Sequence, residues 1–329
     1  MSDNAMFAVW VGIVCLIWAV VILIAYKARK NRGKAKAAKR KVFAPPALDL
    51  SLEDLERLRA KVREDTPKVS LRAVLKAQTS PSLLGSKIGG YPYWPEDLPY
   101  PRDNEGHALA LLAQIDLAAL PENGELPKEG LLQFFVLPDD LYGMDLNEPA
   151  VQNGFRVVYH KTVDRSVTLE AIEAMGVPTS FTCGDLLPHT GEFALEFKKE
   201  TVHMDTDDAR FEEELRRAAA ELSIELPEQF SIYRTFLQKD LHPEWEDENT
   251  GTRLLGYPCF VQGDPRPADS RYDTLLLQID SYYGQKTCPE SSPQRFVLWG
   301  DSGVGNFFIN REDLAAKRFD RVYYTWDCC

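Results

Sequence analysis

The chain has 329 residues, of which 44% are hydrophobic and 27% charged, and its formal net charge is −12. This length fits about two domains or one duplicated unit, and the composition is that of a globular chain with a sizeable core. Nine of the 38 basic residues and one of the 50 acidic residues lie before residue 42, so residues 42–329 carry a net charge of −20. Such a charge argues against nucleic acid as a partner.

The first 50 residues differ from the rest. Residues 5–26 are uncharged, and as a helix they would span roughly 33 Å, enough to cross a bilayer. The segment 27–41 then holds nine Lys or Arg within a basic linker, residues 27–50. The positive-inside rule predicts a single-pass protein of the cell inner membrane, with residues 1–4 outside and the C-terminal domain cytoplasmic. A cleaved signal peptide is disfavoured, because its basic region would precede the apolar run, where Asp3 stands.

Residues 51–329 alternate between helix, strand and turn signals. The segment 51–65 is predicted as a helix with an apolar stripe, and 68–75 as a strand. A Pro-rich aromatic loop covers 89–106, and strands are predicted at 109–117, 130–137 and 155–163. A second helix is expected at 205–222, followed by a loop at 256–266 and strands at 275–280 and 297–309.

Three landmarks occur twice in the same order. A G-Y-P loop (90–92 and 256–258) is followed by a Q-I-D strand (114–116 and 278–280) and by two Phe with an aliphatic residue (134–136 and 307–309). This order predicts two half-repeats, about 51–165 and 200–329, packed as a pseudo-dimer. The predicted fold is α+β: a β-rich, internally duplicated head with mostly antiparallel sheets, preceded by one transmembrane helix.

These landmarks, together with DDLYGMD, FRVVYH, WGDSGVGNFFI and the terminal YTWDCC, resemble the YwqG-like family of bacterial proteins over roughly residues 65–329. The resemblance implies a duplicated, mostly antiparallel α+β fold without an established enzymatic activity. Some relatives lie in toxin–immunity neighbourhoods, which implies a protein-binding role. This sequence departs from the usual pattern of the family by its N-terminal apolar segment.

The two Q-I-D strands offer polar pairs that each point to one face of a strand: Gln114 with Asp116, and Gln278 with Asp280. One interpretation places all four in a central cleft. The other, which we favour, is that they satisfy backbone groups of the neighbouring G-Y-P loops, because buried amides and carboxylates need partners.

The segment 138–145 is predicted to bind a partner. Its Tyr142 and Met144 would serve as apolar anchors within an acidic rim of Asp139, Asp140 and Asp145. The spacing of these acids is not that of a calcium loop, so no metal is expected.

No catalytic template fits the chain. The segment 299–309 lacks the G-x-S-x-G pattern, the five His are scattered, and the Cys residues are expected to be reduced thiols, so no catalytic residue or cofactor is predicted. The predicted function is a membrane-anchored, non-catalytic protein-binding module, such as an immunity protein that neutralises a basic toxin or effector at the cytoplasmic face. The alternative is an enzyme or a small-ligand or metal-binding protein with a cleft between the halves.

Overall fold

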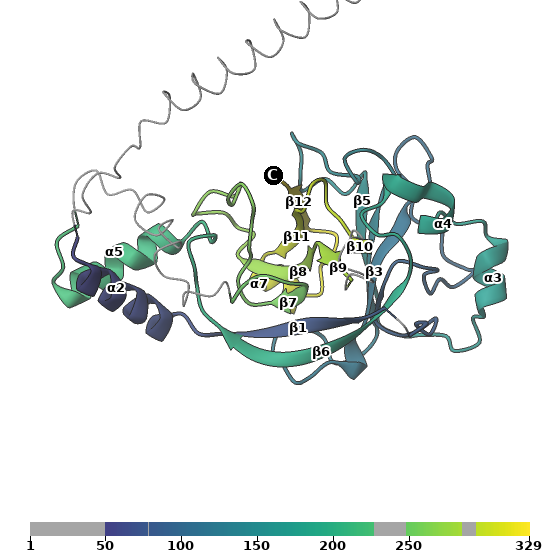
Figure 1. Cartoon of the computed structure of the whole chain (residues 1–329). Coiled ribbons are helices and arrows are strands. Elements are labelled where there is room, and N and C mark those ends of the chain that lie inside the picture. The colour runs from purple at the N-terminus through teal and green to yellow at the C-terminus, as the bar shows by residue number, and fades with distance from the viewer. Residues whose placement is uncertain (1–49, 78, 227–247, 285–293) are drawn as a thin grey trace, which may run out of the picture. The chain divides into compact units, whose positions relative to one another are not determined.

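The computed structural model describes residues 50–77, 79–226, 248–284 and 294–329. Residues 52–329 form one compact unit, which holds every helix and strand described below. Figure 1 shows this unit as a curved sheet with a few short helices.

Ten strands form the sheet in the order β12-β11-β8-β7-β1-β6-β2-β3-β4-β5, and neighbouring strands run antiparallel. Their bounds are β1 (Lys68–Lys76), β2 (Lys87–Ile88), β3 (Ala110–Asp116), β4 (Leu131–Val136), β5 (Phe155–His160), β6 (Phe193–Val202), β7 (Arg253–Leu255), β8 (Thr274–Asp280), β11 (Val304–Ile309) and β12 (Val322–Asp327). A separate hairpin joins β9 (Tyr282–Tyr283) to β10 (Arg295–Val297).

The sheet has the same arrangement on both sides of its centre. The first half contributes β2, β3, β4 and β5, and the second contributes β7, β8, β11 and β12 in the matching order. Between them β1 and β6 pair over nine residues, from Lys68↔Val202 to Lys76↔Ala194. β1, which precedes the first half in sequence, pairs with β7 of the second half, whereas β6 pairs with β2.

The main hydrophobic core lies on the inner face of the curved sheet and is shared by both halves. The rings of Phe134 on β4 and Phe307 on β11 lie 5.0 Å apart. The rings of Phe155 on β5 and Tyr324 on β12, the two end strands, lie 5.2 Å apart. The sheet is therefore nearly closed, because its two ends meet through buried aromatic side chains.

Two helices, α2 (Leu52–Asp65) and α5 (Phe211–Leu222), lie side by side in Figure 1. The second begins later than the predicted residue 205. Acidic side chains before it bind turn amides instead, as Asp208 does at Arg210 (3.0 Å). The other helices in the described ranges are short: α3 (Leu169–Ala174), α4 (Ser180–Cys183), α7 (Arg311–Ala315) and the 3-10 turns η1 (Leu117–Ala119) and η2 (Gly184–Leu186).

The predicted α+β fold of two packed halves is wrong. The described chain is β-rich with few helices, and both halves belong to one nearly closed antiparallel sheet. The physical reason is the pairing of β1 with β6, because it joins the ladders of the two halves through continuous hydrogen bonding.

The predicted transmembrane helix and the single-pass inner-membrane localisation are also corrected. None of the helices in the described part of the chain is long and apolar enough to cross a membrane. The longest of them, α2, has 14 residues and a charged outer face, whereas a membrane span needs about 20 mainly apolar residues. The predicted span itself, residues 5–26, lies outside the described residues.

Candidate functional site

The Gln of the first Q-I-D strand holds the loop that carries the first G-Y-P motif. Gln114 Oε1 accepts a hydrogen bond from the Tyr93 N–H at 2.9 Å. Its Nε2 donates to the carbonyl oxygens of Leu83 and Gly85 at 2.8 and 3.1 Å. Opposite it on β4, Gln133 Nε2 donates to Gln114 Oε1 and to Tyr93 O. Both Gln side chains are fully buried, so these bonds satisfy groups that water does not reach.

The second half repeats the arrangement with one substitution. Gln278 Oε1 accepts from the Cys259 N–H at 2.8 Å. Its Nε2 donates to the carbonyl oxygens of Asn249 and Gly251, each at 2.8 Å. Asn306 takes the place of the Gln on β4 and donates to Cys259 O at 3.0 Å. Two equivalent networks thus fix two equivalent loops.

The two networks lie on the outer face of the sheet. Gln133 precedes Phe134 on β4, and Asn306 precedes Phe307 on β11, and both Phe rings belong to the inner core. Because side chains alternate along a strand, the polar residues face away from that core. In the sheet, four strands separate β3 from β8. The structure therefore does not bring the four predicted polar residues into one cleft: Gln114, Asp116, Gln278 and Asp280.

The two Asp residues differ in what they hold. Asp280 Oδ2 accepts the Gly251 N–H at 2.7 Å, and burial raises the pKa of Asp280 above its ordinary value. In the first half, the N–H of the equivalent Gly85 binds a carbonyl of its own loop. Asp116 uses Oδ1 to cap η1 through the Ala118 N–H at 3.1 Å. The Asp side chain at this strand position thus binds the loop glycine in the second half and not in the first.

A buried cation, which the sequence reasoning missed, lies opposite the Gln of each Q-I-D strand and binds backbone carbonyls. Lys87 on β2 is 1% exposed and lies opposite Gln114. Its Nζ donates to Tyr91 O at 2.6 Å and to the carbonyl oxygens of Ser82 and Leu83 at 3.4 Å. Burial lowers the pKa of Lys87 to about 8.

The second half places Arg253 at the equivalent position on β7, opposite Gln278. Its guanidinium donates to the carbonyl oxygens of Glu248 and Thr250 and lies 3.4 Å from the Glu200 carboxylate. One signal could have revealed the pair. A basic residue stands four positions before the Tyr of G-Y-P in both halves.

His160 on β5 extends the first network. Its Nε2 lies 2.9 Å from Gln133 Oε1, and its ring meets the rings of Tyr93 and Trp94 edge-on at 5.2 Å. Burial lowers the pKa of His160 to about 4, so the imidazole is neutral near pH 7. Because an amide oxygen only accepts, Nε2 carries the hydrogen, and His160 acts as a structural donor.

A groove of about 680 Å³ lies beside the end of β3, next to the first loop. Asp116 and Glu129 line it together with Lys161 and Arg165. None of these four side chains forms a salt bridge with another described residue. The apolar part of the lining comes from two loops and the start of β4, namely Leu83, Leu84, Leu131, Val163 and Val167.

The predicted partner-binding segment 138–145 is a compact turn built by its own carboxylates. Asp139 Oδ1 accepts the N–H groups of Leu141 and Gly143 at 3.0 and 2.8 Å. Asp145 Oδ1 accepts the N–H of Asn147 at 2.8 Å. These two Asp residues therefore organise the backbone of the loop, while Asp140 is exposed.

The two expected anchors of this segment point inward. The Tyr142 ring lies 5.5 Å from the Trp299 ring and 5.2 Å from the Trp326 ring. Met144 Sδ accepts the Trp326 N–H at 3.4 Å, and Tyr324 Oη donates to Tyr142 O at 3.0 Å. Both side chains are half-buried and fasten the loop to β12.

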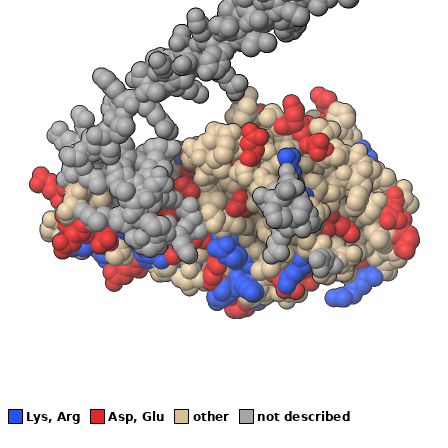
Figure 2. Space-filling view, in the orientation of Figure 1, with Lys and Arg blue, Asp and Glu red and all other residues tan. Residues whose placement is uncertain are grey.

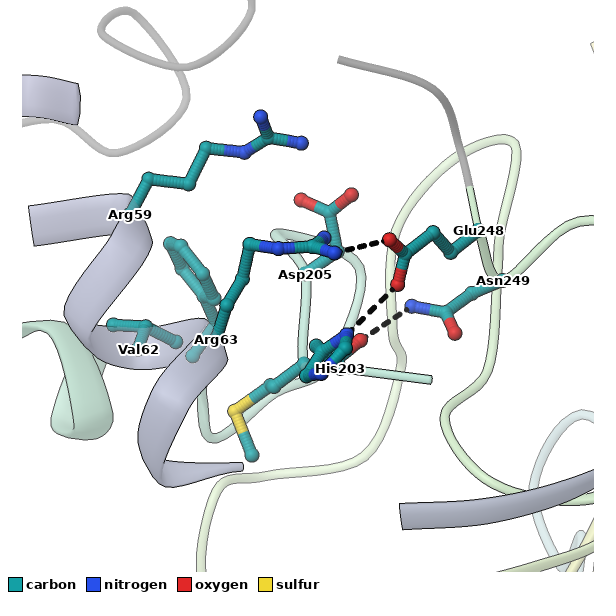
Figure 3. Close-up of a pocket in the computed structure, with 9 residues that line it drawn as sticks. Arg59, Val62, Arg63, His203, Asp205, Glu248 and Asn249 are labelled. Carbon is teal, nitrogen blue, oxygen red and sulfur yellow. Dashed lines mark hydrogen bonds and ion pairs between the residues drawn. The ribbon is translucent and has the colours of Figure 1, made fainter. Parts of the chain in front are cut away.

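A small ion-pair cluster joins α2 to the segment after β6. Figure 3 shows Arg63 and His203 both reaching the carboxylate of Glu248, with His203 Nδ1 at 3.0 Å. Burial raises the pKa of Glu248, but the hydrogen bonds from Arg63 and His203 outweigh it and hold the pKa below its ordinary value. The cavity at this cluster measures about 10 Å³, which is room for about one water molecule. The ion pairs therefore act as a clamp between segments, and the cavity is too small to be a ligand pocket.

Metal-binding chemistry is not assembled in the described ranges: no group of three or more His, Cys, Asp or Glu side chains there is placed to hold a metal ion. None of the described Cys residues, at positions 183, 259, 328 and 329, forms a disulfide. Cys15 and Cys288 lie outside the described residues.

The geometry defines a β-rich domain with two equivalent loops held by buried amides and cations. Residues 86–328 match the model of the family described as "Domain of unknown function (DUF1963)". The match covers well over half of the chain, so this protein belongs to that family. No curated protein matches the sequence.

Proposed function

We propose that this chain is a non-catalytic protein-binding module whose contact surface is the loop between β4 and β5, residues 137–154. One observation carries the proposal. Leu146 exposes 73% of its surface, Val151 49% and Leu141 39%, all within one short loop. Exposed apolar side chains gathered in one segment are typical of interaction sites.

The loop is fixed in advance of binding. Trp326 Nε1 donates to Leu141 O at 2.8 Å, and Tyr324 N donates to Pro149 O at 2.9 Å. Gln152 Nε2 donates to Phe319 O at 2.7 Å. A loop tied down along its length loses little conformational entropy when it binds, which favours affinity.

The charge of the loop favours a basic partner. Residues 137–154 contain four acids and no Lys or Arg. Of these acids Asp140, Asp145 and Glu148 are exposed beside the apolar side chains. Figure 2 shows a group of Lys and Arg side chains along the lower edge of the surface, in the region of β1 and β6. Acidic rims around apolar centres attract basic surfaces and speed their association.

The kind of partner is also part of this proposal. The motifs resemble the YwqG-like family, some of whose members lie in toxin–immunity neighbourhoods. A toxin or effector with a basic surface, neutralised by being bound, is therefore the partner we propose. The buried Gln networks support the non-catalytic reading, because their polar groups already serve the fold.

The proteins encoded by the genes adjacent to this one are the first partners to test. Each is titrated with the full chain by calorimetry, and co-expression is scored for protection against any of them that is toxic. We expect Leu146→Ser to weaken binding of the partner at least tenfold. Val261→Ser is the matched control, since Val261 is also exposed (42%) but lies in a different loop.

Two outcomes would contradict the proposal. One is that no adjacent gene product binds and none is neutralised. The other is a bound partner whose affinity is unchanged by Leu146→Ser while both variants unfold at the wild-type temperature.

A further inference from the structure

We propose that the groove beside Asp116 binds a small zwitterion with an apolar body, for which an unblocked dipeptide of apolar residues is the simplest probe. The groove adjoins Leu131, at the start of β4, whereas the proposed protein-binding loop follows Val136, at its end. The two sites are therefore distinct, and this inference does not rest on the proposed protein-binding function.

The comparison of the two halves points to a ligand at Asp116. In the second half Asp280 is half-buried and accepts the Gly251 N–H, which gives it a structural role. In the first half Gly85 satisfies its own N–H within its loop. Asp116 accepts the Ala118 N–H with one carboxylate oxygen and is among the residues that line the groove. Asp116 therefore makes no hydrogen bond to Gly85 that would match the bond between Asp280 and Gly251.

The groove presents charges of both signs from different segments. Asp116 ends β3, Glu129 lies in the β3–β4 connection, and Lys161 and Arg165 follow β5. Because these groups form no salt bridges with described residues, their charges stay available to a ligand. A ligand ammonium suits the carboxylates, and a ligand carboxylate suits the two cations, with Arg165 able to bind it through two hydrogen bonds.

Apolar lining and size set the rest of the ligand. Leu83, Leu84 and Val167 lie among the groove's lining residues and suit an aliphatic body. A volume of about 680 Å³ falls within the roughly 300–1,000 Å³ typical of small-molecule sites. A free amino acid would leave much of this space empty, whereas a dipeptide fills more of it and keeps both charged ends.

The test is calorimetric titration of the full chain with leucyl-leucine, its N-acetyl form and its C-terminal amide. We expect the parent dipeptide to bind and each blocked form to bind at least tenfold more weakly. Asp116→Asn keeps an oxygen for the Ala118 cap, so the fold is preserved. It should weaken the parent about tenfold and leave the acetylated form unchanged. The double variant Lys161→Ala and Arg165→Ala should do the same for the parent and spare the amide.

Two further variants complete the test. Ala118→Trp, at an exposed lining position, should abolish binding by filling the groove, and Lys128→Ala, exposed but not on the lining, should leave it unchanged. Absence of heat with the parent at several millimolar overturns the proposal, as does equal binding of all three dipeptides or unchanged binding in Ala118→Trp. Thermal unfolding of each variant shows whether a loss of binding is due to misfolding. If a variant misfolds, the test is the binding of the parent and acetylated dipeptides to Asp116→Asn.

Discussion

Lys87 and Arg253 stand at the same position in the two halves of the sheet, and each directs a buried cation at backbone carbonyls of the loop that precedes it. Each also lies opposite the Gln of a Q-I-D strand, so the cation and the amide hold the same loop from neighbouring strands. Burial opposes both charges and lowers the pKa of Arg253 to about 10. The loops are therefore fixed at the cost of burying charge.

The Lys87 charge predicts that stability rises in alkaline solution. Its pKa is about 8 in the folded chain, against an ordinary value of 10.5. Between these values the unfolded chain binds a proton that the folded chain does not, so the unfolding free energy increases with pH. The increase from Lys87 is up to about 3 kcal/mol from pH 8 to 10.5. Urea unfolding at several pH values measures it.

Two variants separate this effect from other alkaline titrations. Lys87→Met should lower stability by about 1–3 kcal/mol through unsatisfied carbonyls and remove its share of the rise. Lys128→Met, at an exposed position, should keep the wild-type slope. Equal slopes in the wild type and Lys87→Met would show that Lys87 stays charged throughout this range.

The separation of the two Gln networks is testable by double-mutant cycles. Gln114→Leu and Gln133→Leu remove partners in one network, so their effects should couple by about 0.5–3 kcal/mol. Gln114→Leu and Gln278→Leu act on different loops and should add to within about 0.5 kcal/mol. Urea unfolding of the three single and two double variants provides the numbers. Strong coupling between Gln114 and Gln278 would mean that the halves share a polar site after all.

The loop between β4 and β5 depends on Gly143. Its φ is 74°, and a Cβ there would clash with the carbonyl of Gly154. Gly124 has a similar φ of 80° with nothing within 4 Å of an added Cβ. Gly124→Ala should therefore cost about 1 kcal/mol from the backbone alone, and Gly143→Ala clearly more. Comparison of their melting temperatures checks this, and equal shifts would contradict the packing described for the loop.

The clamp at Glu248 predicts a loss of stability in acid. Its pKa lies below the ordinary 4.5, so its contribution is present above that pH and fades as the pH falls. Glu248→Gln should lower the unfolding free energy by about 1 kcal/mol near neutral pH. The difference from wild type should shrink as the pH falls below 4.5. Glu64→Gln, at a side chain that is 76% exposed, is the control and should change little.

Much of the strand pattern could be predicted because alternation and turn residues are local signals. The strands around Gln114 and Gln278 and the loops before them fall where periodicity places them. The start of α5 could not be placed, because the acids before Phe211 suit a helix cap and a turn equally well. Their use in turn bonds depends on neighbouring segments.

The long-range contacts could not be predicted, because each depends on a segment far away in the sequence. Nothing local in β1 indicates that it pairs with β7, more than 170 residues away. Lysine is usually a surface residue. The burial of Lys87 depends on backbone carbonyls that accept hydrogen bonds from its ammonium group and offset the cost of desolvation. In the same way, the inward orientation of Tyr142 and Met144 depends on Trp326, which is supplied by the last strand.

The pairing of β1 with β6 and β7 determines where the chain can be cut into fragments that still fold. A chain cut between β5 and β6 leaves β1 without either of its neighbours, because both belong to the downstream fragment. β2 likewise loses β6 and becomes an exposed edge that can pair with other chains. The two pieces should therefore be soluble mainly when produced together. In the intact chain β1 must wait for late-synthesised partners, which makes slow folding and early chaperone contact an expected part of its biogenesis.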